Sequence, residues 1–480
     1  MSLTSAQVRE LIDMTVDHLL EFREKLSRGD LPASYVHDSN NAMAYTAGEQ
    51  AAAAVAESTP PQDATPIPDL LDQLFGEAMT NGTLHPHPGF MAHVPSGGLI
   101  ESAVGEFIAK AVNRFAGVWI AAPGYQQIEQ NVIRWFCSIL GYGEGAFGYL
   151  TTGGSLANFM AVRCALVGAN TPACEDATFY TSDQGHFSVV KAVTMAGVPA
   201  QQVRVVPTVG CRMDIAALSA AVRADRRAGR HPVCVVGTAG STNTGAIDDL
   251  QAVARLCRDE DMWFHADACF GGFFRLTDRG RKALAGIEDA DSIAVDAHKS
   301  LFLPHGNSAI LVKDAERLRA AFDIPRADYL PGLRDGPKPA DLCRYGPELS
   351  REIRGIAAWL PLKTHGLRAF TAALDEKLDL ADRLAEGLTR FPELAVVQSH
   401  PRVLPVVTFQ VSQNRDATNR LCEAICRLGN TYVTTTTVPE HGTVIRACVL
   451  HSETNATVID RFLEDVPAAL AALRSTRREK

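Results

Sequence analysis

The chain has 480 residues, of which 46% are hydrophobic and 21% are charged. This composition is typical of a folded enzyme with two or three domains, or with one large α/β domain and appendages. The formal net charge of −9 at pH 7 argues against a nucleic-acid partner.

The sequence carries no recognisable membrane span or secretion signal. The most apolar long region, 99–122, is interrupted by Glu101, Glu106, Lys110 and Arg114, and the N-terminus lacks a basic segment followed by an apolar one. Eleven cysteines are scattered without a Cys-x-x-Cys pair, which is typical of a reducing compartment. We therefore expect a cytoplasmic protein without a membrane partner.

The first 80 or so residues predict helices that pack on something else rather than forming a core of their own. Residues 5–25 carry an apolar stripe at helical spacing. The segment 58–68 contains four prolines and predicts an extended linker. A second helix is expected over 70–79.

From about residue 145 onward, short apolar runs alternate with helix-like stretches. This alternation predicts an α/β fold with a mostly parallel, seven-stranded sheet covered on both faces. The expected strands are Phe147–Leu150, Phe179–Thr181, Val203–Val206, Val233–Val236, Trp263–Phe264, Ile293–Val295 and Ala309–Val312. The expected helices between them are 155–168, 186–197, 214–229 and 248–260.

The last part of the chain predicts a small C-terminal α+β domain. We expect a long helix over 359–390, a strand over 403–411, a helix near 416–428 and a final helix from about 455. The predicted division is an N-terminal helical segment (1–90), a large domain (91–358) and a small domain (359–480).

Lys299 and Asp267 are the leading candidates for catalysis. Each follows an apolar run expected to be a buried strand, and ligands bind beyond the carboxyl ends of such strands. A lysine that forms a Schiff base and an aspartate that holds a pyridinium nitrogen protonated are what pyridoxal 5'-phosphate requires. We expect burial to lower the pKa of Lys299. A surface lysine, and an aspartate that caps a helix or pairs with an arginine, are the structural alternatives.

Three further segments lie at the same expected edge of the sheet. Gly153, Gly154 and Ser155 end a strand and open a helix, so they suit either a phosphate cradle or an ordinary helix-capping turn. His186 lies at a strand-to-helix junction, where it could stack on a cofactor ring or serve as a structural hydrogen-bonding residue. Thr242 lies in the polar turn 240–245, which is either a cofactor contact or simply a loop.

The segment 85–90, His-Pro-His-Pro-Gly-Phe, raises the question of a metal. No further ligand cluster lies nearby in the sequence, so we predict a cleft-lining loop and no metal site.

These elements together resemble the group II pyridoxal phosphate-dependent amino acid decarboxylases, from about residue 65 to 470. The resemblance is carried by His-Pro-Gly-Phe (87–90), Trp119 with Ala122, Pro123 and Glu129, Gly153-Gly154-Ser155, Ser182-Asp183-Gln184 with His186, Asp267-Ala268 and Asp296-Ala297-His298-Lys299. It implies fold type I and a homodimer that exchanges its N-terminal helical segment.

The resemblance also implies a role for individual residues. Lys299 would be the Schiff-base lysine, Asp267 the pyridinium partner and His186 the stacking residue. The phosphate would be served by Gly154, Ser155 and His298, with Gly153 and Thr242 as further cofactor contacts. Ser96 aligns with the residue that handles the substrate carboxylate, and His93, Val94 and Trp119 are expected to line the substrate pocket. Leu342 is the fourth residue, with Ser96, His93 and Trp119, that we predict to bind substrate.

The chain departs from the family pattern in two places. Ala297 and Ser300 flank the His-Lys pair in an unusual way. Aromatic-type decarboxylases carry a mobile-loop tyrosine that helps to protonate the quinonoid, and that position falls here on Leu342, which has no proton to give. Tyr345 lies three residues out of register.

Three hypotheses follow. The first is decarboxylation of an α-amino acid through an external aldimine and a quinonoid, with release of carbon dioxide. The second, motivated by Leu342, is decarboxylation-dependent oxidative deamination, in which oxygen is used and an aldehyde and ammonia are formed. Similar enzymes of lincosamide antibiotic pathways act on an S-conjugated cysteine. The third is a non-catalytic dimer, which an intact Lys299 and Asp267 argue against.

Overall fold

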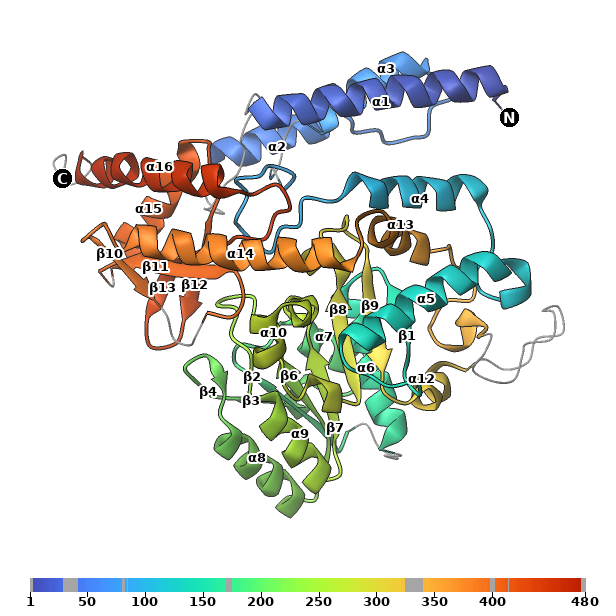
Figure 1. Cartoon of the computed structure of the whole chain (residues 1–480), viewed down its shortest axis with the longest axis vertical. Helices are drawn as coiled ribbons and strands as arrows, with labels where there is room; N and C mark the ends of the chain where they lie inside the picture. Colours follow the sequence, from blue (N-terminus) through green and yellow to red (C-terminus); the bar gives the residue numbers. More distant parts are fainter. Residues whose placement is uncertain are drawn as a thin grey trace.

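The computed structural model of the chain describes residues 3–28, 42–79, 83, 85–169, 175–323, 340–397, 402–412 and 414–475. Figure 1 shows a large α/β body, a smaller sheet with its own helices, and three helices at the N-terminal end.

The body is built on a seven-stranded sheet in the order β1-β9-β8-β7-β6-β2-β3. Its strands are β1 (Phe147–Thr151), β2 (Ala177–Ser182), β3 (Val203–Val206), β6 (His231–Thr238), β7 (Trp263–Asp267), β8 (Ser292–Asp296) and β9 (Ser308–Val312). Neighbouring strands pair in parallel except at β9, which is antiparallel to both β1 and β8. The seven predicted runs coincide with these strands, and the predicted α/β class and mostly parallel sheet are confirmed.

Helices cover both faces of this sheet, as continuous apolar strands require. The helices of this body are α4 (Ile100–Val112), α5 (Pro123–Ile139), α6 (Gly154–Gly168), α7 (Ser188–Met195), α8 (Ile215–Arg227), α9 (Leu250–Asp259), α10 (Asp278–Ala283), α11 (Ala297–Ser300), α12 (Ala315–Phe322) and α13 (Gly355–His365). Shorter elements are the 3₁₀ turns η2 (Trp119–Ala121), η3 (Ala200–Gln202), η4 (Gly272–Leu276), η5 (Ile287–Asp289) and η6 (Leu342–Arg344), and the hairpin β4 (Thr208–Val209) and β5 (Arg212–Met213). Asp214 and Asp249 cap α8 and α9 with their carboxylates.

The small domain has an antiparallel sheet in the order β10-β11-β13-β12. Its elements are β10 (Leu394–Val397), β11 (Val406–Val411), β12 (Thr434–Val438), β13 (Gly442–Cys448), α14 (Leu367–Leu388), α15 (Arg415–Arg427) and α16 (Ala456–Ser475). A second hydrophobic core lies between this sheet and its helices. The predicted small C-terminal α+β unit is therefore present.

The long helix predicted over 359–390 is wrong, because the chain turns between α13 and α14. Gly366 adopts φ +74° there, a backbone conformation that favours glycine. The first half of α14, with Phe370 and Leu374, packs against the core of the large sheet. One helix thus contacts both cores (Figure 1).

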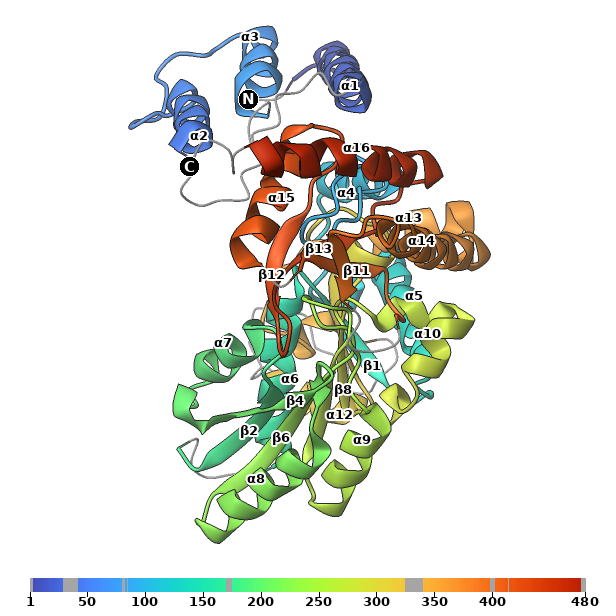
Figure 2. The ribbon, with the colours of Figure 1, turned by 90° about the vertical axis from the view of Figure 1, so that its left-hand side faces the viewer.

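The N-terminal segment consists of α1 (Ser5–Arg28), α2 (Ala42–Ala54), α3 (Ile67–Gln73) and a π turn, η1 (Leu74–Ala78). Figure 2 shows α1, α2 and α3 at one end of the molecule, outside α16. Leu26 joins the core of the small domain, and Arg23 forms an ion pair of 2.8 Å with Glu453. This agrees with helices that have no core of their own.

Within the described part of the chain, no helix is long and apolar enough to cross a membrane.

Candidate active site

The predicted cofactor residues come together at the carboxyl ends of the parallel strands. Asp267 ends β7, and the turn of α11 directly after β8 carries Lys299. A cavity of about 320 Å³ lies between them. It is lined by Thr152, Gly153, Gly154, Ser155, Gln184, His186, Ser188, Thr238, Gly240, Ser241, Thr242, Asp267, Cys269, Phe270, Asp296, His298, Lys299, His305 and Gly306.

The Lys299 ammonium is held by a carboxylate. Its Nζ lies 2.8 Å from Oδ2 of the buried Asp296, whose Oδ1 accepts a hydrogen bond of 2.6 Å from Ser308 Oγ. Burial is the largest single effect and disfavours the charged amine, but the attraction of Asp296, with smaller contributions from Cys269 and Asp267, raises the pKa of Lys299 above its ordinary value. The expected lowering of this pKa is therefore wrong, because the charge of Asp296 outweighs the effect of burial.

The Asp267 carboxylate is buried and bound only by neutral donors. Asn158 Nδ2 donates to Oδ2 at 3.1 Å and the Cys269 backbone N–H donates to Oδ1 at 3.3 Å. Among the residues that the structure describes, no cationic side chain forms an ion pair with it. A buried carboxylate calls for a positive partner, so the pyridinium N–H of pyridoxal phosphate fits this position.

The start of α6 forms the opposite wall. No side chain caps the start of α6 at Gly153, and Gly153, Gly154 and Ser155 line the cavity. The first backbone N–H groups of a helix lie at its positive end and have no acceptor within the helix, which suits a phosphate. A Cβ at Gly154 would collide with Cys269 Sγ and would lie 3.0 Å from Asp296 Oδ1. Glycine is therefore needed at 154 for close packing against β8.

His186, His298 and Thr242 complete the predicted set. Ser188 Oγ lies 2.7 Å from His186 Nδ1, and burial lowers the pKa of His186 against the attraction of Asp267. His298 Nδ1 lies 3.1 Å from the Asn307 carbonyl. Thr242 accepts a hydrogen bond of 2.8 Å from Arg446 Nε through its carbonyl, which ties the polar turn to the small domain.

The four predicted substrate-binding residues do not line this cavity. Ser96 donates to the Leu303 carbonyl at 3.0 Å, and His93 Nδ1 lies 3.3 Å from His85 Nε2. The backbone N–H of Trp119 donates to Asp341 at 2.6 Å. Leu342 is fully buried in the core of the large domain, which corrects the expectation of a mobile, substrate-facing position within this chain. Contact of Ser96, His93 and Trp119 with substrate stays a prediction.

Sequence reasoning missed several side chains of the site. Asp296 stands three residues before Lys299, so the spacing alone could have indicated an ion pair. Asn158, Ser188 and His305 carried no such signal, because a lone polar residue within a helix or loop does not show which cavity it lines. Among the described residues, no group of three or more His, Cys, Asp or Glu side chains could hold a metal ion.

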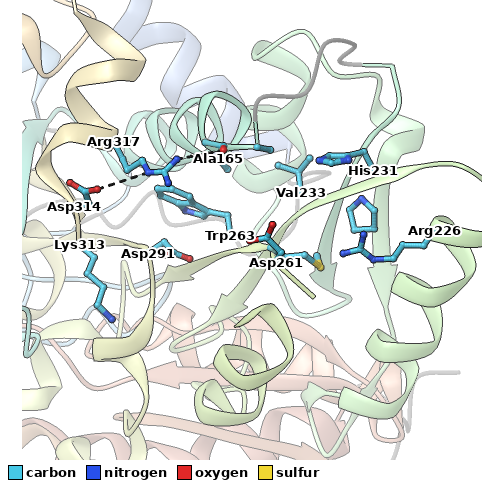
Figure 3. A pocket seen from close by; sticks show the side chains of 14 residues that line it. Ala165, Arg226, His231, Val233, Asp261, Trp263, Asp291, Lys313, Asp314 and Arg317 are labelled. Carbon is cyan, nitrogen blue, oxygen red and sulfur yellow. Dashed lines mark hydrogen bonds and ion pairs between the residues drawn. The ribbon is translucent and has the colours of Figure 1, made fainter. Parts of the chain in front are cut away.

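A second cavity of about 400 Å³ lies at the amino ends of the strands. Figure 3 shows Trp263, Asp291, Lys313 and Arg317 around it. Trp263 opens β7 at this edge, whereas Asp267 closes the same strand at the first cavity.

Comparison with known proteins gives consistent results. The family model described as the pyridoxal-dependent decarboxylase conserved domain matches residues 52–412. An aromatic-L-amino-acid decarboxylase of Bacillus atrophaeus is 31% identical over 98% of this chain and 96% of its own length. A phenylacetaldehyde synthase of Petunia hybrida is 25% identical over 85% of this chain and 86% of its own.

The fold agrees as well. The crystal structure of Oryza sativa TDC with PLP and tryptamine superposes with a TM-score of 0.86 at 22% identity, over 100% of this chain and 99% of that one. The match to the family model spans well over half of the chain and confirms the predicted resemblance, cofactor and enzyme class. This protein belongs to the pyridoxal-dependent decarboxylase family.

Proposed function

We propose that the protein removes the α-carboxylate of an amino acid as carbon dioxide, using pyridoxal phosphate. The observation that carries this proposal is the placement of Lys299 and Asp267 in one cavity at the carboxyl ends of β7 and β8. Bound pyridoxal phosphate supplies an electron sink for the bond that breaks at the α-carbon.

The side chains divide the work of holding the cofactor. Lys299 provides a side-chain amine that can bond covalently to the aldehyde of the cofactor. Asp267 keeps the ring nitrogen protonated, and His186 covers the ring. Gly154 and Ser155, at the start of α6, provide N–H and O–H donors for the phosphate.

The proposal is tested with Lys299→Ala. The purified wild-type protein should show an absorption band near the visible edge and should release carbon dioxide from an amino acid. Both should be lost in the variant, and both should be kept in a control, Lys282→Ala, which removes an exposed lysine of α10. A wild-type protein without the band after incubation with pyridoxal phosphate would contradict the proposal.

A second candidate is decarboxylation coupled to oxidative deamination. It is favoured by Leu342, which offers no proton at the position of the family's tyrosine, and by the similarity to a protein named phenylacetaldehyde synthase. Carbon dioxide, amine, ammonia and peroxide should be measured together for a panel of amino acids that includes S-conjugated cysteines. Amine without peroxide would exclude the oxidative route, and aldehyde with ammonia and peroxide would establish it.

We also propose that the active unit is a cytoplasmic homodimer. Helix α1 exposes Val8, Val16 and Leu20, and α4 exposes Val104 and Phe107. Rows of exposed apolar side chains on helices are typical of an interface. A reducing compartment is supported by the ten described cysteines, all of them buried and outside disulfides.

Light scattering on the purified protein tests the dimer. Wild-type protein should have twice the mass of one chain. The substitution Phe107→Glu should give monomers, while Val209→Glu, on the exposed β4 hairpin, should leave the mass unchanged. A monomeric wild-type protein would refute the dimer.

A further inference from the structure

A continuous network of hydrogen bonds runs from the amino ends to the carboxyl ends of the central strands of the large sheet. It begins at Trp263, beside the second cavity (Figure 3), and it ends at Asp267 and His186 in the candidate active site. The links between them are Ser292, His265, Asn158 and Ser188, all of which are buried. None of these four has a role in the proposed function.

The first links run from Trp263 through Ser292 to His265. An indole N–H can only donate, so Trp263 donates to Ser292 Oγ at 2.8 Å. Ser292 Oγ, at 2.9 Å, and the Ser292 carbonyl oxygen, at 3.2 Å, both face His265 Nδ1, so these contacts allow the hydroxyl either to donate to this nitrogen or to accept from it. Burial, against the attraction of Asp267, lowers the pKa of His265 to about 4, so at neutral pH this ring has one proton, whose position is decided by the groups at its other nitrogen.

The direction of the last links is fixed by the carboxylate. An ionised carboxylate can only accept, so the Asn158 amide must turn its nitrogen toward Asp267 Oδ2 at 3.1 Å. The Asn158 oxygen then faces His265 Nε2 at 2.9 Å and accepts the proton that this ring offers. The carboxylate end thus places the single proton of His265 on Nε2 and leaves Nδ1 to accept from the Ser292 hydroxyl.

The second hydrogen of the Asn158 amide extends the chain to His186. Asn158 Nδ2 also donates to Ser188 Oγ at 2.9 Å. Since Ser188 Oγ accepts there, its hydrogen is available for His186 Nδ1 at 2.7 Å, and the Ser188 backbone N–H points to the same nitrogen at 3.3 Å. His186 Nδ1 is therefore an acceptor, and its proton lies on Nε2.

We propose that Asn158 and His265 are positioning residues that fix the orientation of the Asp267 carboxylate and the Nε2–H form of His186. The inference rests on the proposed function for the roles of Asp267 and His186 toward the cofactor. The orientation of the Asp267 carboxylate and the position of the His186 proton are set by the hydrogen-bond network, with or without the cofactor. His265 keeps the amide from rotating, and the amide then serves the two cofactor residues at once.

The consequence is a coupling between two residues of the site. Loss of the Asn158 amide removes a donor from Asp267 and, in the same step, frees the Ser188 hydroxyl to turn away from His186. A purely structural asparagine would affect stability without changing the form of His186.

Selective ¹⁵N labelling of histidine in the full-length protein, studied by NMR without added cofactor, tests the proton positions. The His186 and His265 signals are assigned by their loss in His186→Gln and His265→Gln. In the wild-type protein both rings should be neutral with the proton on Nε2. A charged His265, or a proton on Nδ1 of either ring, would overturn the inference.

Variants of the network give the second test. In Asn158→Leu, His186 should change to a mixture of both neutral forms, and pyridoxal phosphate should bind about ten-fold more weakly or worse, since a hydrogen bond to a charged group is lost. His265→Gln, which keeps an N–H toward Asn158, should retain more affinity than His265→Phe. An unchanged His186 form in Asn158→Leu would refute the proposal.

A matched control separates positioning from stability. Tyr180→Phe removes a buried hydroxyl of the same sheet that donates to Asp225 at 2.7 Å, away from the cavity, and should leave both the His186 form and cofactor affinity unchanged. If the wild-type protein binds no pyridoxal phosphate, the proposed function fails, while the NMR result still decides the inference on its own.

Discussion

At the scale of single residues, His451 is a fully buried histidine between the loop that carries Pro86 and the small domain. Its Nε2 donates to the Pro86 carbonyl at 3.0 Å, and its Nδ1 accepts from the Glu453 backbone N–H at 3.1 Å. Burial lowers the pKa of His451 to about 4. The folded protein therefore holds this ring neutral, and protonation opposes folding.

The expected result is a pH-dependent effect of His451→Gln. Above pH 6.5 the ring is neutral in both states, but as the pH falls from 6.5 toward 4 the unfolded chain takes up the proton first and the folded state loses stability. By pH 5 this loss is about 2 kcal/mol. The destabilisation by His451→Gln at pH 7 should thus shrink by about 2 kcal/mol at pH 5, measured by urea unfolding. A gap that stays constant would contradict a buried neutral ring.

Residues at strand ends could be predicted from the sequence, and residues that act through distant partners could not. Lys299 and Asp267 each follow an apolar run, and the edge of a parallel sheet places them together. Asn158 meets Asp267 across 109 positions of the chain, and its own helix gives no sign of that partner. Leu342 was assigned by alignment, which does not reveal burial in a core.

At the scale of elements, the start of α6 uses its two glycines differently. A Cβ at Gly154 would collide with Cys269, whereas a Cβ at Gly153 would meet nothing within 4 Å. Gly153 has φ 173°, an extended conformation that any residue adopts. Gly154 is thus required for packing and Gly153 is not.

The substitution Gly154→Ala should destabilise the cofactor-free protein by about 1–3 kcal/mol through overpacking. Gly153→Ala serves as the matched control and should change the unfolding free energy by less than about 0.5 kcal/mol. Denaturant unfolding of both variants without pyridoxal phosphate measures the difference. Equal losses would show that the two positions pack alike.

Strands were easier to predict than helix boundaries. Six of the seven strands of the large sheet are almost entirely buried and read as short apolar runs, and the edge strand β3, where Val205 is exposed, is apolar as well. The break between α13 and α14 was missed because apolar periodicity continues through it, and a single glycine with positive φ decides the turn. The 3₁₀ turns have no periodicity that the sequence could reveal.

At the scale of the whole molecule, a buried ion pair anchors the segment that leads into α13, the last helix before α14 and the small domain. Arg351 Nη2 lies 2.6 Å from Glu129 Oε1 on α5, and both side chains are almost completely buried. The other oxygen of Glu129 accepts from the backbone N–H groups of Arg354 and Gly355. One carboxylate therefore fixes the path of the chain as it enters α13.

Removing this carboxylate should have a large effect. Glu129→Ala leaves a guanidinium buried without its partner and should cost about 3–5 kcal/mol of unfolding free energy. Asp460→Ala, which breaks the exposed pair with Arg383, should cost no more than about 1 kcal/mol. Denaturant unfolding compares the two, and similar losses would contradict the role of Glu129.

The ion pair between Lys299 and Asp296 has a consequence for the kinetics of assembly. An amine attacks an aldehyde only in its neutral form, and Asp296 raises the pKa of Lys299, so the competent form is scarce at neutral pH. The rate at which the cofactor-free protein captures pyridoxal phosphate should rise about ten-fold per pH unit from pH 7 to 9. Asp296→Asn should speed this capture at pH 7, as stopped-flow absorbance can record, so that the residue that holds the lysine in place also delays the maturation of the enzyme.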